Sequence, residues 1–464
     1  MSRALQAVDE SSKINLGRRY QSFQRVFERF SLGYSHFLPA GNRRCPLTVK
    51  VSDRVRVAAL LVSIGVAGTQ AASYLLNVIA ARLLVPATFG ELGSLLAVLV
   101  VGAVPAMGLQ TAAALRVARI RERGELSTRD TGQLYSMGLA TSGTVTAIAL
   151  AAAPLLMLLL HLESIVPALF VAISLMSITM ICLSYGILQG TQRFATMAGL
   201  LAFEAVGRIG GTVIGLVVFR NAIGALAGTA IGAALVAFAG WLVCGRPRPQ
   251  RHDKGHVGEV LHAVQAMFAL VLLVNLDLVL ARHHLPAHEA GEYAVGSIVT
   301  KIAYWLPQAV AILVLPRLAS EDGRRKMVPR ALGICAALDA VVVLGAATMG
   351  PTIVAVIGGK EYANADIPVW PFAFVGSMLS LVQILLYSRI ASADRKSTVL
   401  LWLAVAVEII LVTTWLHDEL TQVVTAAAVS TSLLVLAGAA IEVRSRRGVE
   451  PVHTGRHDGG HGQQ

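Results

Sequence analysis

Charge is scarce in this chain. Of its 464 residues, 14% are charged and 55% are hydrophobic. A soluble domain of average composition carries about 25% charged residues, and the mean hydropathy of +0.66 lies well outside that class. The composition therefore excludes an ordinary soluble protein and predicts a membrane protein.

Cysteine is scarce as well, and its spacing excludes two further classes. The four cysteines, Cys45, Cys182, Cys244 and Cys335, lie far apart, without a CxxC pair or a zinc-ligand spacing. Three of them fall within or at the ends of apolar runs, where cysteine behaves as a small buried hydrophobe. We predict no disulfide, no redox centre and no metal site. The outer histidines 283, 284 and 288 also lack a regular ligand spacing.

The common catalytic signatures are absent too. The chain has no GxxxxGK[ST] phosphate loop, no G-x-S-x-G elbow and no HExxH helix. An enzyme alternative, a membrane sugar polymerase or ligase, should show a long outer loop with catalytic Arg or His, and no outer connection is long enough. We therefore predict a protein that is not an enzyme, needs no cofactor and acts between its helices.

Residues 1–56 are polar and basic, and residues 1–50 contain no apolar core of the length that a secretory signal needs. Within them Tyr20, Phe23, Phe27 and Phe30 recur at spacings of three and four, with arginines between them. The pattern fits an amphipathic helix on an anionic membrane surface. A basic tail, or an over-long predicted start, is the alternative.

Long apolar runs dominate the rest of the chain, and a bilayer needs about 20 helical residues to cross. Helices are the expected spans, because each satisfies its own backbone hydrogen bonds in lipid. We predict twelve, at about 57–81, 92–114, 134–160, 165–187, 198–219, 222–244, 257–281, 293–315, 331–357, 367–390, 399–416 and 420–441.

The basic residues determine the predicted orientation. The odd-numbered connections hold only Arg82, Arg220, Arg282 and Lys360, whereas the even-numbered connections and the C-terminal tail hold most of the other Lys and Arg. Positive charge concentrates on cytoplasmic loops, so both termini are predicted to be cytoplasmic. The net charge of +12 then reflects topology, and we predict no nucleic-acid partner.

An internal repeat divides the chain into two halves. ARLLVPATFGE at 81–91 and ARHHLPAHEAGE at 281–292 share Ala-Arg, Pro-Ala and Gly-Glu in the same order between apolar runs. We predict an all-α polytopic membrane protein of two six-helix bundles, 57–244 and 257–441. A cytoplasmic linker at 245–256 joins them, and a disordered tail at 442–464 follows.

Charges at membrane depth cost on the order of 3 kcal/mol each, so they usually face a cavity or a partner. Glu204 and Arg208 are four residues apart on one helix and can pair, so a structural ion pair is the alternative to a substrate site. Lys301 has no partner on its own helix and lies about 12 Å below the outer surface by helical rise. Lys301 is the strongest single candidate for substrate binding.

Three carboxyl groups are candidates for ion or proton coupling. Asp339 and Glu408 lie roughly half-way along their runs, where burial favours the protonated form. Asp277 lies near an outer end, where an interfacial cap is the alternative. Each could instead be neutral and structural. Glu204 and Glu408 occupy comparable places in the two halves, which predicts that they lie on opposite sides of one cavity.

Small residues and prolines predict how helices pack and bend. Glycines recur every four residues at 207, 211 and 215 in the fifth run and at 224, 228 and 232 in the sixth, a spacing that lets helix backbones approach closely in lipid. Pro105 and Pro307 interrupt the second run of each half at similar depth, where a kink is expected.

Two helical halves with polar groups between them are the plan of a secondary transporter. The segments ARLLVPATFGELGSLLAV, GILQGTQRFATMAGLLAFEAVGRIGGTVIGLVV and LDLVLARHHLPAHEAGEYAVGSIVTKIAYWLPQAVAILVLPRLAS resemble the Wzx-like oligosaccharide flippase branch of the multidrug/oligosaccharidyl-lipid/polysaccharide (MOP) superfamily. The resemblance covers nearly all of residues 55–445 and rests on diffuse motifs. It implies two bundles around a central cavity that opens to each side in turn.

The resemblance also implies a substrate of sugars on a polyprenyl pyrophosphate, carried to the outer leaflet of the cell's inner membrane. Arg208 and Lys301 are then expected to hold the pyrophosphate, and Asn77, Gln110, Tyr304 and Gln308 to meet the sugars. Expected partners are membrane lipids and a polysaccharide polymerase or glycosyltransferases of the same pathway.

Departures from related branches keep one alternative open. The drug/toxin-extrusion branch commonly has an acidic residue in its first helix, and 57–81 has none. The lipid II flippase branch usually has two further helices after the twelfth, whereas this chain continues into a polar tail. A cation-coupled small-molecule antiporter remains the alternative function.

Overall fold

The computed structural model describes residues 53–124, 126–250, 258–305, 321–362, 365–390 and 396–447. The predicted amphipathic helix near residues 20–30, half of the linker (251–256), Pro307 and most of the tail (448–464) lie outside these ranges. Within them every regular element is a helix. The all-α prediction is confirmed.

The first half contains six helices, two of them interrupted. They are α2 (Asp53–Leu83), α3 (Pro86–Gly102) continued by α4 (Val104–Arg123), α5 (Thr128–Leu159), α6 (Val166–Gly190), α7 (Phe194–Glu204) continued through the π-helix η2 (Ala205–Ile209) into α8 (Gly210–Phe219), and α9 (Ala222–Val243).

The second half repeats the plan. Its helices are α10 (Gly258–His284), α11 (Ala287–Trp305), α13 (Glu321–Gly358) with the 3-10 turn η4 (Gly359–Tyr362), α14 (Val369–Ile390), α15 (Lys396–Thr414) and α16 (Leu420–Arg447). Each predicted run thus has its helix, although α2 begins inside the predicted basic segment. In the described part of the chain, nine helices are long and apolar enough to cross a membrane.

Local sequence accounts for where several helices begin and break. Ser127 and Asp130 form a capping box at the start of α5, and the side chain of Asn221 accepts a hydrogen bond from the Gly224 amide at the start of α9. The second helix breaks at Ala103, two residues before Pro105. Proline cannot donate the backbone bond that an unbroken helix needs there, so the predicted kink is confirmed at Pro105.

The third helix of each half lies at the periphery. In the membrane-spanning window of α5, 17% of residues are buried inside the protein, and in that of α13, 22%. Leu158 on α5 and Val341 on α13 are among the exposed apolar side chains. Lipid solvates such surfaces, so the exposed apolar residues agree with a membrane location.

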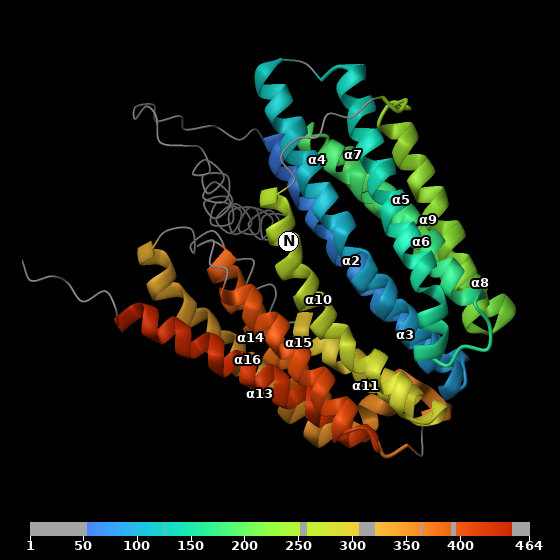
Figure 1. Ribbon diagram of the computed structural model, residues 1–464, viewed down its shortest axis with the longest axis vertical. Coiled ribbons are helices and arrows are strands. Elements are labelled where there is room, and N and C mark those ends of the chain that lie inside the picture. The colour runs from blue at the N-terminus through green and yellow to red at the C-terminus, as the bar shows by residue number, and fades with distance from the viewer. Residues whose placement is uncertain are drawn as a thin grey trace, which may run out of the picture.

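The two halves meet through α3 and α4 of the first and α10 and α11 of the second. In Figure 1 the ribbons of the two halves converge where α3 and α11 lie and diverge toward the other end. Gly90 and Gly291 mark the crossing: a Cβ on Gly90 would lie 2.8 Å from the Gly291 nitrogen, and one on Gly291 would overlap the Pro86 carbonyl. The two copies of the repeated motif therefore contact each other.

The predicted glycine packing occurs between α8 and α9. A Cβ on Gly211 would overlap the Gly228 carbonyl oxygen, and the pairs Gly215/Gly224 and Gly207/Gly232 are equally close. This glycine seam, the six residues 207, 211, 215, 224, 228 and 232, brings the two backbones into contact.

Candidate functional site: buried charges in two halves

The six charges predicted at membrane depth lie in described helices and fall into separate groups. Glu204 and Arg208 lie in the first half, whereas Asp277, Glu408 and Lys301 lie near one another in the second half. Asp339 lies in the second half between α13 and α14. The three carboxyl groups of the second half are thus not matched by three cations.

Glu204 and Arg208 form the predicted pair. Arg208 Nε lies 3.1 Å from Glu204 Oε1, with the two side chains 24% and 16% exposed. The hydroxyl of Tyr185 on α6 donates to the other carboxylate oxygen at 2.6 Å. Arg208 lies within the π-helix η2, which begins directly after Glu204. A single π-helical turn inside an α-helix often occurs at functional sites.

Asp277 is 3% exposed, so the interfacial-cap alternative is wrong. The Tyr293 hydroxyl donates to its Oδ2 at 2.9 Å, and the Leu278 amide donates to Oδ1 at 2.8 Å. Tyr293 is fully buried on the next helix, α11. The carboxyl therefore holds α10 and α11 together inside the second half.

Glu408 is completely buried on α15. Its Oε2 accepts a hydrogen bond of 2.9 Å from the Ser430 hydroxyl on α16. Its Oε1 has no hydrogen-bond partner among the described residues. Glu408 interacts electrostatically with Asp277. The structure therefore groups Glu408 with Asp277 inside the second half, where Glu408 is 0% exposed.

Lys301 lies on α11, next to the interface between the halves. Its side chain is partly exposed, and its charge interacts with Asp277. Its backbone carbonyl accepts a 3.4 Å hydrogen bond from the Tyr74 hydroxyl on α2. Lys301 is therefore a cation of the second half whose backbone contacts the first helix of the other half.

Asp339 forms a third, smaller site. It is 3% exposed, and Ser380 on α14 donates to its Oδ2 at 2.7 Å. Its Oδ1 has no hydrogen-bond partner in the described part of the chain. Both Asp339 and Glu408 thus combine one hydroxyl contact with one unpaired carboxyl oxygen.

The predicted sugar-binding residues lie in different places. Asn77 is half-buried on α2 and donates to the Ser73 carbonyl at 2.8 Å. Gln110 on α4 lies 3.5 Å from the Gln189 amide oxygen on α6. Tyr304 is buried against Trp305 in an edge-to-face contact. Gln308 lies outside the described residues.

Helix α2 connects the two cation sites. It packs against α7 and η2, which carry Glu204 and Arg208, and it also contacts α11, which carries Lys301. Tyr74 and Asn77 lie on it one turn apart, and Tyr74 makes the bond to Lys301. A ligand that bridged the two cations would therefore pass along α2.

Sequence reasoning missed the hydroxyl partners Tyr185, Tyr293, Ser430, Ser380 and Tyr74. Each reaches its partner from a different helix, and in Tyr74 and Lys301 the partners are 227 positions apart. No local spacing signals such contacts. What the sequence did show was carboxyl groups within apolar runs. A carboxyl group in an apolar interior requires a hydrogen-bond donor, so these carboxyl groups indicated that such partners exist.

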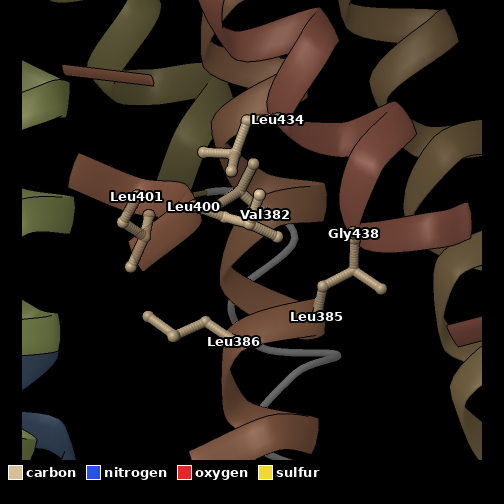
Figure 2. Close-up of a pocket in the computed structure, with 7 residues that line it drawn as sticks. All are labelled: Val382, Leu385, Leu386, Leu400, Leu401, Leu434 and Gly438. Carbon is tan, nitrogen blue, oxygen red and sulfur yellow. The ribbon is translucent and has the colours of Figure 1, made fainter. Parts of the chain in front are cut away.

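A small cavity lies away from these charges, between α14, α15 and α16. Its volume is about 30 Å³, and it is lined almost entirely by hydrocarbon, from Val382, Leu385, Leu386, Leu400, Leu401, Leu434 and Gly438. Figure 2 shows these side chains around it. It offers no polar group to a sugar or a phosphate. Among the described residues no group of three or more His, Cys, Asp or Glu is arranged to hold a metal ion.

These features define a class: a polytopic helical membrane protein of two six-helix halves, with a half-buried ion pair in the first half and buried carboxyl groups in the second. No protein-family model and no curated protein sequence matches the chain.

Solved structures do match. One is the "inward-facing conformation of a multidrug resistance MATE family transporter of the MOP superfamily", with a TM-score of 0.65 and 14% identity, over 82% of this chain and 96% of that one. Another is "lipid II flippase MurJ, inward closed conformation", with a TM-score of 0.65 and 15% identity, over 83% and 87%.

A MOP superfamily transporter from Pyrococcus furiosus matches with a TM-score of 0.51 and 13% identity, over 84% and 97% of the two chains. At such identities the similarity shows the fold. The chain has the fold of MOP superfamily transporters.

Proposed function

We propose that this protein is a transporter that moves a polyprenyl-pyrophosphate-linked oligosaccharide from the inner to the outer leaflet of the cell's inner membrane by alternating access. The observation that carries the proposal is the placement of one cation in each half, Arg208 and Lys301, on helices that border α2. Pyrophosphate is a multiply charged anion, so a site for it in an apolar interior requires cations.

The state of the two cations supports a ligand-binding role. Arg208 binds Glu204 through Nε alone, and its terminal nitrogens have no hydrogen-bond partner in the described part of the chain. A guanidinium can offer those nitrogens to two phosphate oxygens at once. Lys301 makes no ion pair within 4.0 Å of a described carboxylate. Both cations thus retain capacity for an anion, and Asn77, Gln110, Tyr304 and Gln308 would meet the sugars.

The buried carboxyls supply a candidate for energy coupling. Asp277, Glu408 and Asp339 are at most 3% exposed, and the cation found to interact with this group of three is Lys301, through Asp277. A buried carboxylate without a counter-ion is costly, so such groups usually bind a proton or a cation. We propose that movement of protons or cations through this group drives the change of access.

The three buried carboxyl groups, Asp277, Glu408 and Asp339, also support the second candidate function, a cation-coupled antiporter of small molecules. One further matching structure is described as a "MATE multidrug transporter", with a TM-score of 0.58 and 13% identity. The two functions share the fold and the coupling chemistry, and they differ in what Arg208 and Lys301 would bind. A cationic drug would be repelled by both, which is why we prefer the anionic lipid.

The test is deletion of the gene, followed by measurement of polyprenyl-linked oligosaccharide on the inner leaflet. We expect accumulation that wild type reverses and Lys301→Ala reverses at least about tenfold less well, at equal protein level. Lys360→Ala is the matched control, because Lys360 is an exposed lysine of the same half. The glycosyltransferases and polymerase that would be partners can be sought by co-purification from the same cells.

The result that would contradict the proposal is a deletion strain with no accumulation and new sensitivity to cationic dyes. That outcome would favour the antiporter. Accumulation that Lys301→Ala reverses as well as wild type would retain the flippase and remove Lys301 from its site.

A further inference from the structure

Two arginines occupy equivalent places in the repeat, at the predicted outer end of the first helix of each half. Arg82 lies in the last turn of α2, and Arg282 lies in the last turn of α10. Both belong to the repeated Ala-Arg pair of the sequence. Neither is part of the proposed substrate site.

Arg82 reaches from the first half into the second. Its Nε donates to the Val356 carbonyl oxygen at 3.1 Å, and a terminal nitrogen donates to the same oxygen. Val356 lies in the last turn of α13, where helix carbonyls lack intrahelical partners. The side chain also packs beside Gly359, which follows α13.

Arg282 makes the equivalent contact in the opposite direction. Its Nε donates at 3.1 Å to the carbonyl of Leu160, which ends α5 in the first half. Helices α5 and α13 are the third helices of their halves. Each arginine therefore caps the C-terminal end of the third helix of the other half, where a helix favours positive charge.

We infer that Arg82 and Arg282 form a reciprocal clamp that holds the predicted outer ends of the two halves together and so favours the outward-closed state. Both bonds join halves that must separate at this end when the carrier opens outward. The inference concerns the gate only, so it holds whichever solute the protein carries.

The two contacts of the clamp, which we call its Arg82 arm (Arg82 with Val356) and its Arg282 arm (Arg282 with Leu160), differ in their surroundings. Arg82 is exposed, and the turn η4 that it packs against also carries Lys360 and Glu361. Arg282 is 8% exposed and lies next to a cluster of four histidines from both halves. His283 Nδ1 lies 2.9 Å from the Leu159 carbonyl oxygen.

The histidine rings are in mutual contact. His161 of the first half stacks on His283 with centroids 5.3 Å apart, His283 and His284 are 4.7 Å apart, and His284 and His417 are 5.2 Å apart. The other charged groups near them are Glu91, which interacts with Arg282, Glu163, which interacts with Glu91, and Asp418, 3.8 Å from His417.

Protonation of these rings at low outer pH would place several positive charges against one another and against Arg282. Glu91 and Asp418 would offset only part of that repulsion. We therefore expect the contact of Arg282 with Leu160 to weaken at low outer pH, whereas the contact of Arg82 with Val356 should not change.

Accessibility of a cysteine between the halves tests the clamp without any substrate. The four native cysteines are replaced by alanine, and Asn77, half-buried on α2 near the Tyr74 contact, is changed to Cys. A membrane-impermeant maleimide is added to the outside of intact cells. We expect Arg82→Ala and Arg282→Ala each to raise the labelling rate at least about fivefold, and the double variant to exceed both.

The matched control is Arg220→Ala, which removes an exposed arginine from the predicted outer end of α8 that makes no bond to the other half in the described structure. It should leave labelling unchanged. Equal labelling in wild type and in both clamp variants, at equal amounts of folded protein, would overturn the clamp. Labelling only from the cytoplasmic side would overturn its outer location.

Labelling at two outer pH values tests the proton sensitivity of the Arg282 contact. Lowering the outer pH from about 7.5 to about 5.5 should raise labelling in the wild type and in Arg82→Ala. The rise should disappear in Arg282→Ala and when His161, His283, His284 and His417 are changed to Gln together. A rise that persists in the histidine variant would overturn the proton sensitivity and leave the clamp in place. Failure of the flippase assay would not affect any of these outcomes.

Discussion

The fifth and sixth helices and the eleventh and twelfth are the same pair in the two halves, and they bury a glutamate in opposite ways. In the first half, Glu204 binds Arg208 on its own helix, and the two helices touch through the glycine seam. In the second half, the hydrogen-bond partner of Glu408 among the described residues is the Ser430 hydroxyl. The sequence of α15 contains no glycine at all.

This difference indicates that the two halves of the fold are suited to different roles. Glu204 and Arg208 neutralise each other, so their burial requires no proton or ion from outside. Glu408 and Asp277 are two buried carboxyl groups, and Lys301 is the cation that interacts with Asp277. One cation cannot neutralise two carboxylates, so binding of a proton or a cation would favour the burial of the second one. The first half is therefore suited to a fixed site for an anionic substrate, and the second half is suited to coupling.

The largest expected effect breaks the glycine seam. Gly228→Val would push a side chain into the Gly211 backbone, where nothing flexible can move. We expect loss of about 3 kcal/mol or more of stability, measured as a lower melting temperature in detergent. Gly210→Ala is the control, because its Cβ would meet nothing within 4 Å.

The counterpart in the second half should tolerate the same kind of change. A Cβ on Gly438 of α16 would lie 3.0 Å from the end of the flexible Leu385 side chain. Gly438→Ala should therefore cost under about 1 kcal/mol. An equal loss in Gly228→Val and Gly438→Ala would show that the seam has no special role.

A smaller effect distinguishes the two glutamates. Glu204→Gln leaves the Arg208 guanidinium without a carboxylate, and we expect a loss of about 1–2 kcal/mol, limited by the partial exposure of Arg208. Glu408→Gln removes a buried acid and should leave stability unchanged or raise it. Thermal unfolding in detergent measures both.

For transport, the two variants should rank in the opposite order from their ranking by stability, with the larger effect in Glu408→Gln. Glu408→Gln should abolish the dependence of transport on a proton or ion gradient, whereas Glu204→Gln should retain it. Reconstituted vesicles with imposed gradients provide the measurement. Retained gradient dependence in Glu408→Gln would remove this carboxyl from the coupling group.

A further comparison concerns two tyrosines with the same role. Tyr185 donates to Glu204 and Tyr293 donates to Asp277. Tyr293→Phe should cost about 2 kcal/mol and Tyr185→Phe about 1 kcal/mol. Glu204 retains its hydrogen bond from Arg208, whereas the hydrogen bond that Asp277 retains comes from the Leu278 backbone amide. Tyr74→Phe, which loses a 3.4 Å bond, is the control. Equal losses in all three would contradict the comparison.

Much of the fold followed from patterns that local chemistry imposes. A helix needs about 20 apolar residues to cross a bilayer, so the twelve helices were visible in the sequence. The glycine spacing predicted the contact of α8 with α9, and Pro105 predicted the break at Ala103. The pairing of Glu204 with Arg208 was predictable because residues four apart share one face of a helix.

The sites that join distant segments were not predictable in this way. The sequence indicated that Asp277 was near a helix end, and the tertiary structure placed it at full burial beneath Tyr293. The equivalence of Glu204 and Glu408 held for the repeat but not for their surroundings. Side chains from other helices determine those surroundings, and the sequence of a single helix does not specify which helices pack against it.

The sequence by itself determined the number of helices, their two-fold repetition and which charges lie within helical runs, since hydropathy and helical spacing act within one segment. The tertiary structure alone decided which charges meet. Asp277 lies with Glu408, Lys301 lies beside α2, and Arg82 and Arg282 each bond to the opposite half. Such contacts depend on packing between segments that are often more than a hundred residues apart, where no local spacing can specify a partner.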